Sequence, residues 1–325
     1  MLRTRVNEVL GIEHPVLLAP MGRWAEASLA LAVSEAGGLG SFGAWASMGI
    51  DEEYVRGAIA QIRAGTDKPF AAGFATHHIP LSRPQLNAVL EEEVPVVMLS
   101  FADPTPWIPM IHDAGSTVVC QVQSFDAARQ AVDAGSDVIC VQGASAGGHT
   151  GNESLLPLLI QVVETFPDVP VVASGGVTSG RSLAAVLAAG AEGAWMGTAF
   201  LVASEALFTE PPGLVEAILA SDGRDTIRSG AIDVLFNAWG SDRPPWPDGI
   251  AMRSRTNPFV EEWHGREAIL AADRERVAGY VERLSEPDFF PMLYGEGAGA
   301  VTTSQPASAI LSGLINDAVT QLNRF

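Results

Sequence analysis

The sequence predicts an α/β protein, a (β/α)8 TIM barrel with a C-terminal helical cap. Short runs of apolar and β-branched residues recur up to about residue 200, and between them lie alanine-rich stretches whose apolar residues are three and four apart. Most of these helix-like stretches end in glycine, as helices do. Parallel β/α units alternate in this way, and eight of them can close into a barrel. An open, doubly wound sheet is the alternative, although no strand leads into a dinucleotide-type GxGxxG turn.

The eight expected strands follow one another at regular intervals. They are VLLAP (16–20), LGSFG (39–43), FAAGF (70–74), VVMLS (96–100), TVVCQV (117–122), VICVQG (138–143), VVASGG (171–176) and GAWMG (193–197). Cys120 and Cys140 fall inside two of these runs, where a free cysteine behaves as a small buried hydrophobe. Two cysteines in a chain of this length form no disulfide framework.

The composition changes after about residue 205. Segment 205–298 is rich in proline and tryptophan and then in charged helical sequence, so we expect it to cap the active-site face of a barrel made of 1–204 and 299–325. Its aromatic side chains either wall an apolar pocket or pack the cap onto the barrel. They are Phe236, Trp239, Trp246 and Trp263.

Charge and hydropathy exclude several classes of protein. The net charge is −19 among 325 residues, and no basic patch of the kind that binds nucleic acid is visible. No apolar stretch is long enough to span a membrane, and the N-terminus lacks the pattern of a signal peptide. We therefore expect a cytoplasmic protein without nucleic-acid or membrane partners, and a homodimer as its assembly.

Glycines cluster where a barrel of this kind binds phosphate. ASGGVTSG (173–180) follows the seventh strand and MGTAFL (196–201) follows the eighth, the two positions at which TIM barrels often hold a phosphate group. The N–H groups of Gly176, Gly197 and Thr198 are candidates for cradling a phosphate. Tight turns in any β/α protein would look similar at one such loop, but two consecutive loops favour a phosphate site.

The segment QGASAGGHTG (142–151) places one histidine among glycines after the sixth strand. Gly147, Gly148 and Gly151 would let the backbone lie against a flat ligand, with His149 projecting into the site. We expect His149 to be catalytic, whereas His77 and His78 after the third strand are weaker candidates for contact with substrate. No metal-binding motif, nucleophile elbow or Walker loop is present.

These motifs resemble those of the nitronate monooxygenase (2-nitropropane dioxygenase) family, FMN-dependent TIM barrels related to a flavin-dependent enoyl-ACP reductase. The resemblance covers nearly the whole chain: LLAPM (17–21), QGASAGGHTG, ASGGVTSGRSLAAVLAAGAEGAWMGTAFL (173–201), RTNPFVEEWHG and YGEGAGAV. It implies FMN-dependent oxidation of alkyl nitronates and nitroalkanes with dioxygen. His149 would be the catalytic base or would stabilise the anionic nitronate.

The resemblance also implies the contacts of FMN, with each residue numbered as in this sequence. The isoalloxazine would be bordered by Ala19, Pro20 and Met21, hydrogen-bonded by Gln121 and passed by Gly147 and Gly148, while Gly175, Gly176, Gly197 and Thr198 would hold the phosphate. No metal is implied.

One position departs from the family pattern. Members often carry asparagine after the third strand, where this chain has Gly73 in PFAAGF, so Thr76 or His77 would have to supply the missing hydrogen bond. Two other functions stay open from the residues. One is an NADH-dependent flavin reductase of the enoyl or quinone type, and the other is a barrel that binds a phosphorylated ligand without redox chemistry.

Overall fold

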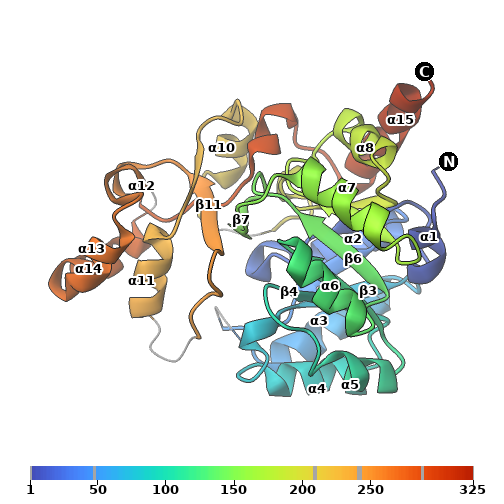
Figure 1. Cartoon of the computed structure of the whole chain (residues 1–325), viewed down its shortest axis with the longest axis horizontal. Coiled ribbons are helices and arrows are strands. Elements are labelled where there is room, and N and C mark those ends of the chain that lie inside the picture. Colours follow the sequence, from blue (N-terminus) through green and yellow to red (C-terminus); the bar gives the residue numbers. More distant parts are fainter. Residues whose placement is uncertain (1, 47–48, 208–210, 240–243, 287–288, 325) are drawn as a thin grey trace.

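The computed structural model describes residues 2–46, 49–207, 211–239, 244–286 and 289–324 (Figure 1). Eight parallel strands form its main sheet in the order β1-β9-β8-β6-β5-β4-β3-β2. They are β1 (Val16–Leu18), β2 (Gly40–Gly43), β3 (Phe70–Ala75), β4 (Val96–Ser100), β5 (Thr117–Val122), β6 (Val138–Gln142), β8 (Val171–Ser174) and β9 (Gly193–Met196). The two ends of this order meet, because Leu17 of β1 bridges Leu39 next to β2. The sheet is a nearly closed barrel, which confirms the predicted fold.

Helices cover the outside of the barrel. They are α2 (Ala27–Glu35), α3 (Glu52–Gly65), α4 (Arg83–Glu91), α5 (Ile108–Asp113), α6 (Phe125–Asp133), α7 (Leu155–Thr165), α8 (Gly180–Ala188) and the short α9 (Thr198–Leu201). The last helix, α15 (Ala307–Leu322), returns from the cap and packs against α8 and α2 (Figure 1).

Alternate strand residues fill two separate cores. Leu17, Met98 and Cys140 belong to a cluster inside the barrel, which Val6 and Leu10 of α1 (Arg5–Leu10) join at one end. The neighbouring strand residues point outward into a larger cluster beneath the helices. This alternation is what a filled small barrel requires, because side chains leave no pore inside it.

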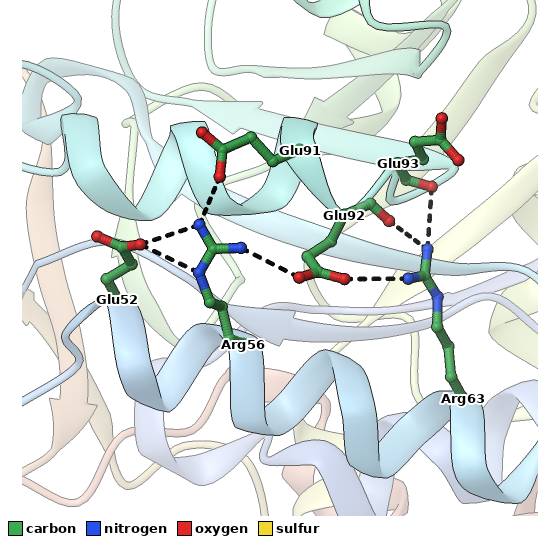
Figure 2. A network of polar contacts seen from close by, with 6 residues as sticks. All are labelled: Glu52, Arg56, Arg63, Glu91, Glu92 and Glu93. Carbon is green, nitrogen blue, oxygen red and sulfur yellow. Dashed lines mark hydrogen bonds and ion pairs between the residues drawn. The ribbon is translucent and has the colours of Figure 1, made fainter.

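An ion-pair network joins α3 to the end of α4 on the outer surface (Figure 2). Arg56 lies 2.9 Å from Glu52 and 2.5 Å from Glu91, and Glu92 lies 3.0 Å from Arg56 and 3.3 Å from Arg63. These side chains are all at least partly exposed, so solvent screens each pair and its contribution to stability is small. The network fixes two adjacent helices without touching the carboxyl ends of the strands.

A second unit of structure follows α9. Its elements are α10 (Leu214–Ala220), β10 (Thr226–Ser229), α11 (Ala231–Trp239), β11 (Ala251–Arg255), α12 (Pro258–Trp263), α13 (Glu267–Ala272) and α14 (Arg274–Glu282). Leu235, Phe259 and Trp263 are buried in a hydrophobic cluster of its own. By contrast, α10 packs beside barrel residues such as Leu201 through a different cluster.

The glycine-rich segment after β6 connects the two units. No strand was predicted between residues 143 and 171, but Gly148–Thr150 form one, β7, that pairs antiparallel with β11 in a three-stranded sheet β10-β11-β7. His149 lies opposite Met252 in that register. The histidine therefore lies on a strand shared between barrel and cap.

Candidate active site

A cavity of about 630 Å³ opens at the carboxyl ends of the barrel strands, where the cap adjoins them. Both units contribute to its wall: β1, β4, β5, β6, β8 and β9 end there, and α11 and the segment before β11 face them. The structure brings all eleven predicted site residues to this one cavity. They are Ala19, Pro20, Met21, Gln121, Gly147, Gly148, His149, Gly175, Gly176, Gly197 and Thr198.

His149 is paired with a carboxylate from the cap. Its Nε2 lies 2.7 Å from Oδ1 of Asp233, and both side chains are 12% exposed. A carboxylate only accepts hydrogen bonds, so Nε2 carries the proton when the ring is neutral and Nδ1 is left with its lone pair. No described residue forms a hydrogen bond with Nδ1. Asp233 thus fixes the tautomer of the imidazole ring in which Nδ1 keeps its lone pair and can accept a proton.

Asp233 was not predicted from the sequence. It lies in the first turn of α11, 84 residues after His149, and no spacing rule connects the two. One signal was present, because AIDVLFNAW is an apolar helix with a single carboxylate, and buried carboxylates need a partner. The other oxygen, Oδ2, is buried without a hydrogen bond to any described residue.

Aromatic rings surround the imidazole. The Trp246 indole stacks on His149 with ring centroids 3.4 Å apart and planes 14° apart, and the Phe101 ring meets Trp246 edge-on at 5.0 Å. Phe101 has a φ of +77°, a conformation that is costly for a residue with a side chain and that often marks functional sites. Trp246, Phe236 and Trp239 line the cavity, which is the first of the two arrangements expected for the aromatic residues of the cap. Trp263 is instead buried inside the cap.

The glycine loops after β8 and β9 present free main-chain donors. The N–H groups of Gly175, Gly176, Val177, Gly197 and Thr198 form no hydrogen bond to another described residue. Both Gly175 and Gly176 have positive φ, and a Cβ at Gly175 would lie 2.7 Å from the Gly143 carbonyl oxygen. Consecutive unpaired donors of this kind form an anion site.

Two further glycines join this cradle from the far end of the chain. Gly295 and Gly297 line the same cavity, and the Gly295 N–H donates to Oγ1 of Thr198 over 3.1 Å. Thr198 therefore binds the cap return as well as facing the cavity. Their sequence, YGEGAGAV, was noted as a motif, but no site role was predicted for it.

The two glycines before His149 serve different needs. At Gly147 a Cβ would lie 2.4 Å from the Tyr294 carbonyl carbon, so this glycine lets the main chain at Tyr294 pack closely, and it also lines the cavity. At Gly148, with φ +72°, a Cβ would meet no atom within 4 Å, so this residue is open toward the cavity.

The position where the family pattern has asparagine is closed. A Cβ on Gly73 would lie 2.3 Å from Cγ of Pro20, so β3 packs directly against a residue of the cavity wall. The predicted substitutes, Thr76 and His77, do not line the cavity, whereas His78 does. Burial, together with the nearby His78 and His149, lowers the pKa of His77 to about 3, so this ring stays neutral.

The described residues show no features of a metal site, a membrane-spanning helix or a reactive cysteine. They contain no group of three or more histidine, cysteine, aspartate or glutamate side chains that could hold a metal ion. None of the helices in the described ranges is long and apolar enough to cross a bilayer. Cys120 and Cys140 are free and buried, and burial raises the pKa of the Cys120 thiol to about 12, which keeps it protonated and unreactive.

Fold and site together place the chain among TIM-barrel oxidoreductases. The family model for nitronate monooxygenase matches residues 3–78 and 75–211, and the chain belongs to this family.

Three known proteins resemble the whole chain. A Mycobacterium tuberculosis protein named (3aS,4S,5R,7aS)-5-hydroxy-7a-methyl-1-oxo-octahydro-1H-indene-4-carboxyl-CoA dehydrogenase is 35% identical, with 99% of this chain and 97% of that protein covered. FabK from Thermotoga maritima has a TM-score of 0.85 at 30% identity and covers 100% of this chain and 98% of its own. A nitroalkane oxidase from Streptomyces ansochromogenes has a TM-score of 0.78 at 25% identity, covering 98% and 100%.

Proposed function

We propose that the chain is an FMN-dependent oxidoreductase whose substrate is a carbon acid, a molecule with a C–H bond made acidic by a neighbouring nitro or carbonyl group. The observation that carries this proposal is the pair His149 and Asp233 on the wall of the cavity that also holds the glycine cradle. A base with a fixed tautomer beside an anion site suits proton abstraction next to a phosphorylated cofactor.

The residues present fit FMN. Free N–H groups at Gly175, Gly176, Gly197 and Thr198 would hold its phosphate, and Gln121 would hydrogen-bond the ring system. Ala19, Pro20 and Met21 would border the isoalloxazine on one side, with the open Gly148 close to it. When bound, FMN would take electrons from the substrate and deliver them to dioxygen.

His149 would act through Nδ1. This nitrogen takes the acidic proton of the substrate, while Nε2–H stays hydrogen-bonded to Asp233 and the carboxylate stabilises the imidazolium that forms. When the substrate is already an anionic nitronate, the protonated ring instead donates a hydrogen bond to the anion. The stacked Trp246 indole keeps water away from one face of the imidazole.

Two substrate classes deserve a direct comparison. Alkyl nitronates and nitroalkanes are supported by the family match and by the nitroalkane oxidase neighbour. Acyl-CoA thioesters are supported by the relative that shares 35% identity and is named an indene-4-carboxyl-CoA dehydrogenase. In nitroalkanes and in acyl-CoA thioesters the carbon beside the activating group is acidic, so one base serves either chemistry.

The absorbance spectrum of the purified protein tests the cofactor, and anaerobic additions test the substrate. We expect flavin bands that are bleached by propionate 3-nitronate or by an acyl-CoA, and not by NADH. Bleaching by NADH alone would indicate a reductase instead. A protein that shows no flavin bands after incubation with FMN and removal of the unbound flavin would refute the proposal and leave a barrel that binds another phosphorylated ligand.

A further inference from the structure

Three buried glutamines form a chain behind the cavity wall. Gln121 belongs to β5, Gln142 ends β6 and Gln123 follows β5; their exposures are 8%, 4% and 8%. Nε2 of Gln123 lies 3.3 Å from Oε1 of Gln121 and 3.0 Å from Oε1 of Gln142. Nε2 of Gln142 donates to the main-chain carbonyl of His149 over 3.1 Å. The chain thus runs from the cavity wall to the strand of the base.

The orientation of all three amides follows from one fixed point. The carbonyl of His149 can only accept, so Gln142 must turn its –NH2 toward it and its oxygen toward Gln123. Gln123 then meets two oxygens, and its own –NH2 must face both. The oxygen of Gln121 accepts the hydrogen bond from Gln123, so the –NH2 group of Gln121 points away from Gln123.

The free end of the chain faces the cavity. Gln121 and Gln142 line it, whereas Gln123 lies behind them and lines only a smaller neighbouring hollow. Nε2 of Gln121 has no hydrogen bond to another amide or to a carbonyl of the described residues, while its side chain hydrogen-bonds the Cys140 thiol on the neighbouring strand. One N–H bond is therefore left for whatever occupies the cavity.

Gly151 makes room for this arrangement. A Cβ at that position would lie 2.7 Å from Cβ of Gln123, so a larger residue would push Gln123 out of line. This gives the third glycine around His149 a role that concerns the glutamine chain and not direct contact with a ligand.

We propose that Gln123 is a positioning residue that fixes Gln121 as a hydrogen-bond donor toward the cofactor and ties this donor to the main chain at His149. The inference rests on the proposed function, in which Gln121 contacts FMN. Gln123 itself touches neither the cavity ligand nor the imidazole. Its effect should therefore appear first in how tightly the cofactor is held.

Gln123→Glu should reverse the orientation of the Gln121 side-chain amide. A carboxylate has no donor for the two facing oxygens. Gln142 stays fixed by the carbonyl of His149, so Gln121 turns its –NH2 toward the new carboxylate and then offers an oxygen to the ligand. Gln123→Met removes the donors without adding charge and leaves Gln121 free to turn either way. Gln130→Glu on the exposed face of α6 adds the same charge next to the smaller hollow without touching the chain.

The measurement is the dissociation constant of FMN from the apoprotein, obtained by titration of flavin fluorescence. We expect about tenfold weaker binding or more for Gln123→Glu, the effect of one lost hydrogen bond, a smaller loss for Gln123→Met and none for Gln130→Glu. The reduction potential of bound FMN should shift in the same order, which a purely structural role would not produce.

The outcomes separate the two proposals. If the wild type binds no FMN, the proposed function fails. If the wild type binds FMN and a folded Gln123→Glu protein binds it equally well, the role of Gln123 is refuted. A loss in Gln123→Glu with none in Gln123→Met would assign the effect to charge and would also refute it. Should Gln123→Glu not fold, Gln123→Met decides alone: unchanged affinity and potential refute the role.

Discussion

Replacing Asp233 with asparagine removes the charge behind His149 while keeping the shape of the side chain. The carboxylate oxygen lies 2.7 Å from Nε2, the length of a strong, charge-assisted hydrogen bond. Such a bond contributes about 1.5–3 kcal/mol, or about 10- to 150-fold in rate if it acts fully on the imidazolium. Asparagine can also donate to Nε2, which moves the ring proton to Nδ1 and blocks the base. We therefore expect kcat/KM for a neutral carbon acid to fall by about a hundredfold or more.

The same substitution should not destabilise the fold. Oδ2 of Asp233 is buried without a partner, so the wild type already carries the cost of a poorly solvated carboxylate, and a neutral amide lowers that cost. The assay is anaerobic flavin reduction by stopped flow, with thermal unfolding measured on the same samples and Asp222→Asn, an exposed carboxylate, as the matched control. A kcat/KM within twofold of wild type at unchanged Tm would refute the role given to this pair.

Three other predictions concern the neighbours of the site. Trp246→Leu should lower kcat about three- to tenfold, since an aromatic pair is worth about 0.5–1.5 kcal/mol; steady-state kinetics would contradict this if kcat were unchanged. Gly73→Ala should destabilise the fold by about 1–3 kcal/mol because its Cβ would overlap Pro20, and urea unfolding that matches wild type would show that the contact yields. His77→Leu should remove a pH dependence of stability. The unfolded chain binds a proton below about 6.5 that folded His77 accepts only near 3, so wild-type stability should fall as pH drops between these values, by at most about 1.4 kcal/mol per pH unit. Equal slopes for the variant and wild type in acid unfolding would contradict this assignment.

The barrel could be predicted because its signal is local. Each of the eight strands lies on one of the eight predicted runs, and the alternation of Leu17 and its neighbours between two cores follows from strand geometry alone. Residues at the carboxyl ends of such strands meet by topology, which is why Gly175 and Gly197 could be placed at one site before any distance was known.

Contacts between the barrel and the cap could not be predicted in the same way. Asp233 reaches His149 through the pairing of β7 with β11, and no periodic pattern reveals that GHT is a strand of three residues. The packing of Gly147 against Tyr294 could not be predicted for the same reason, because Tyr294 comes from a segment far along the chain. The contact between Gly73 and Pro20 could not be predicted either, because a glycine in a sequence does not indicate which neighbour occupies the space of the absent side chain.

The three-residue ladder between β7 and β11 restricts how this enzyme can evolve. Successive side chains of a strand point to opposite faces, so a slip of one residue relative to β11 would turn His149 away from Asp233. The connection between α11 and β11 can change in length, and the pocket walls it carries can diversify with substrate. The register opposite His149 cannot drift. Relatives with new substrates should therefore differ most in that connection and least in the backbone of β11.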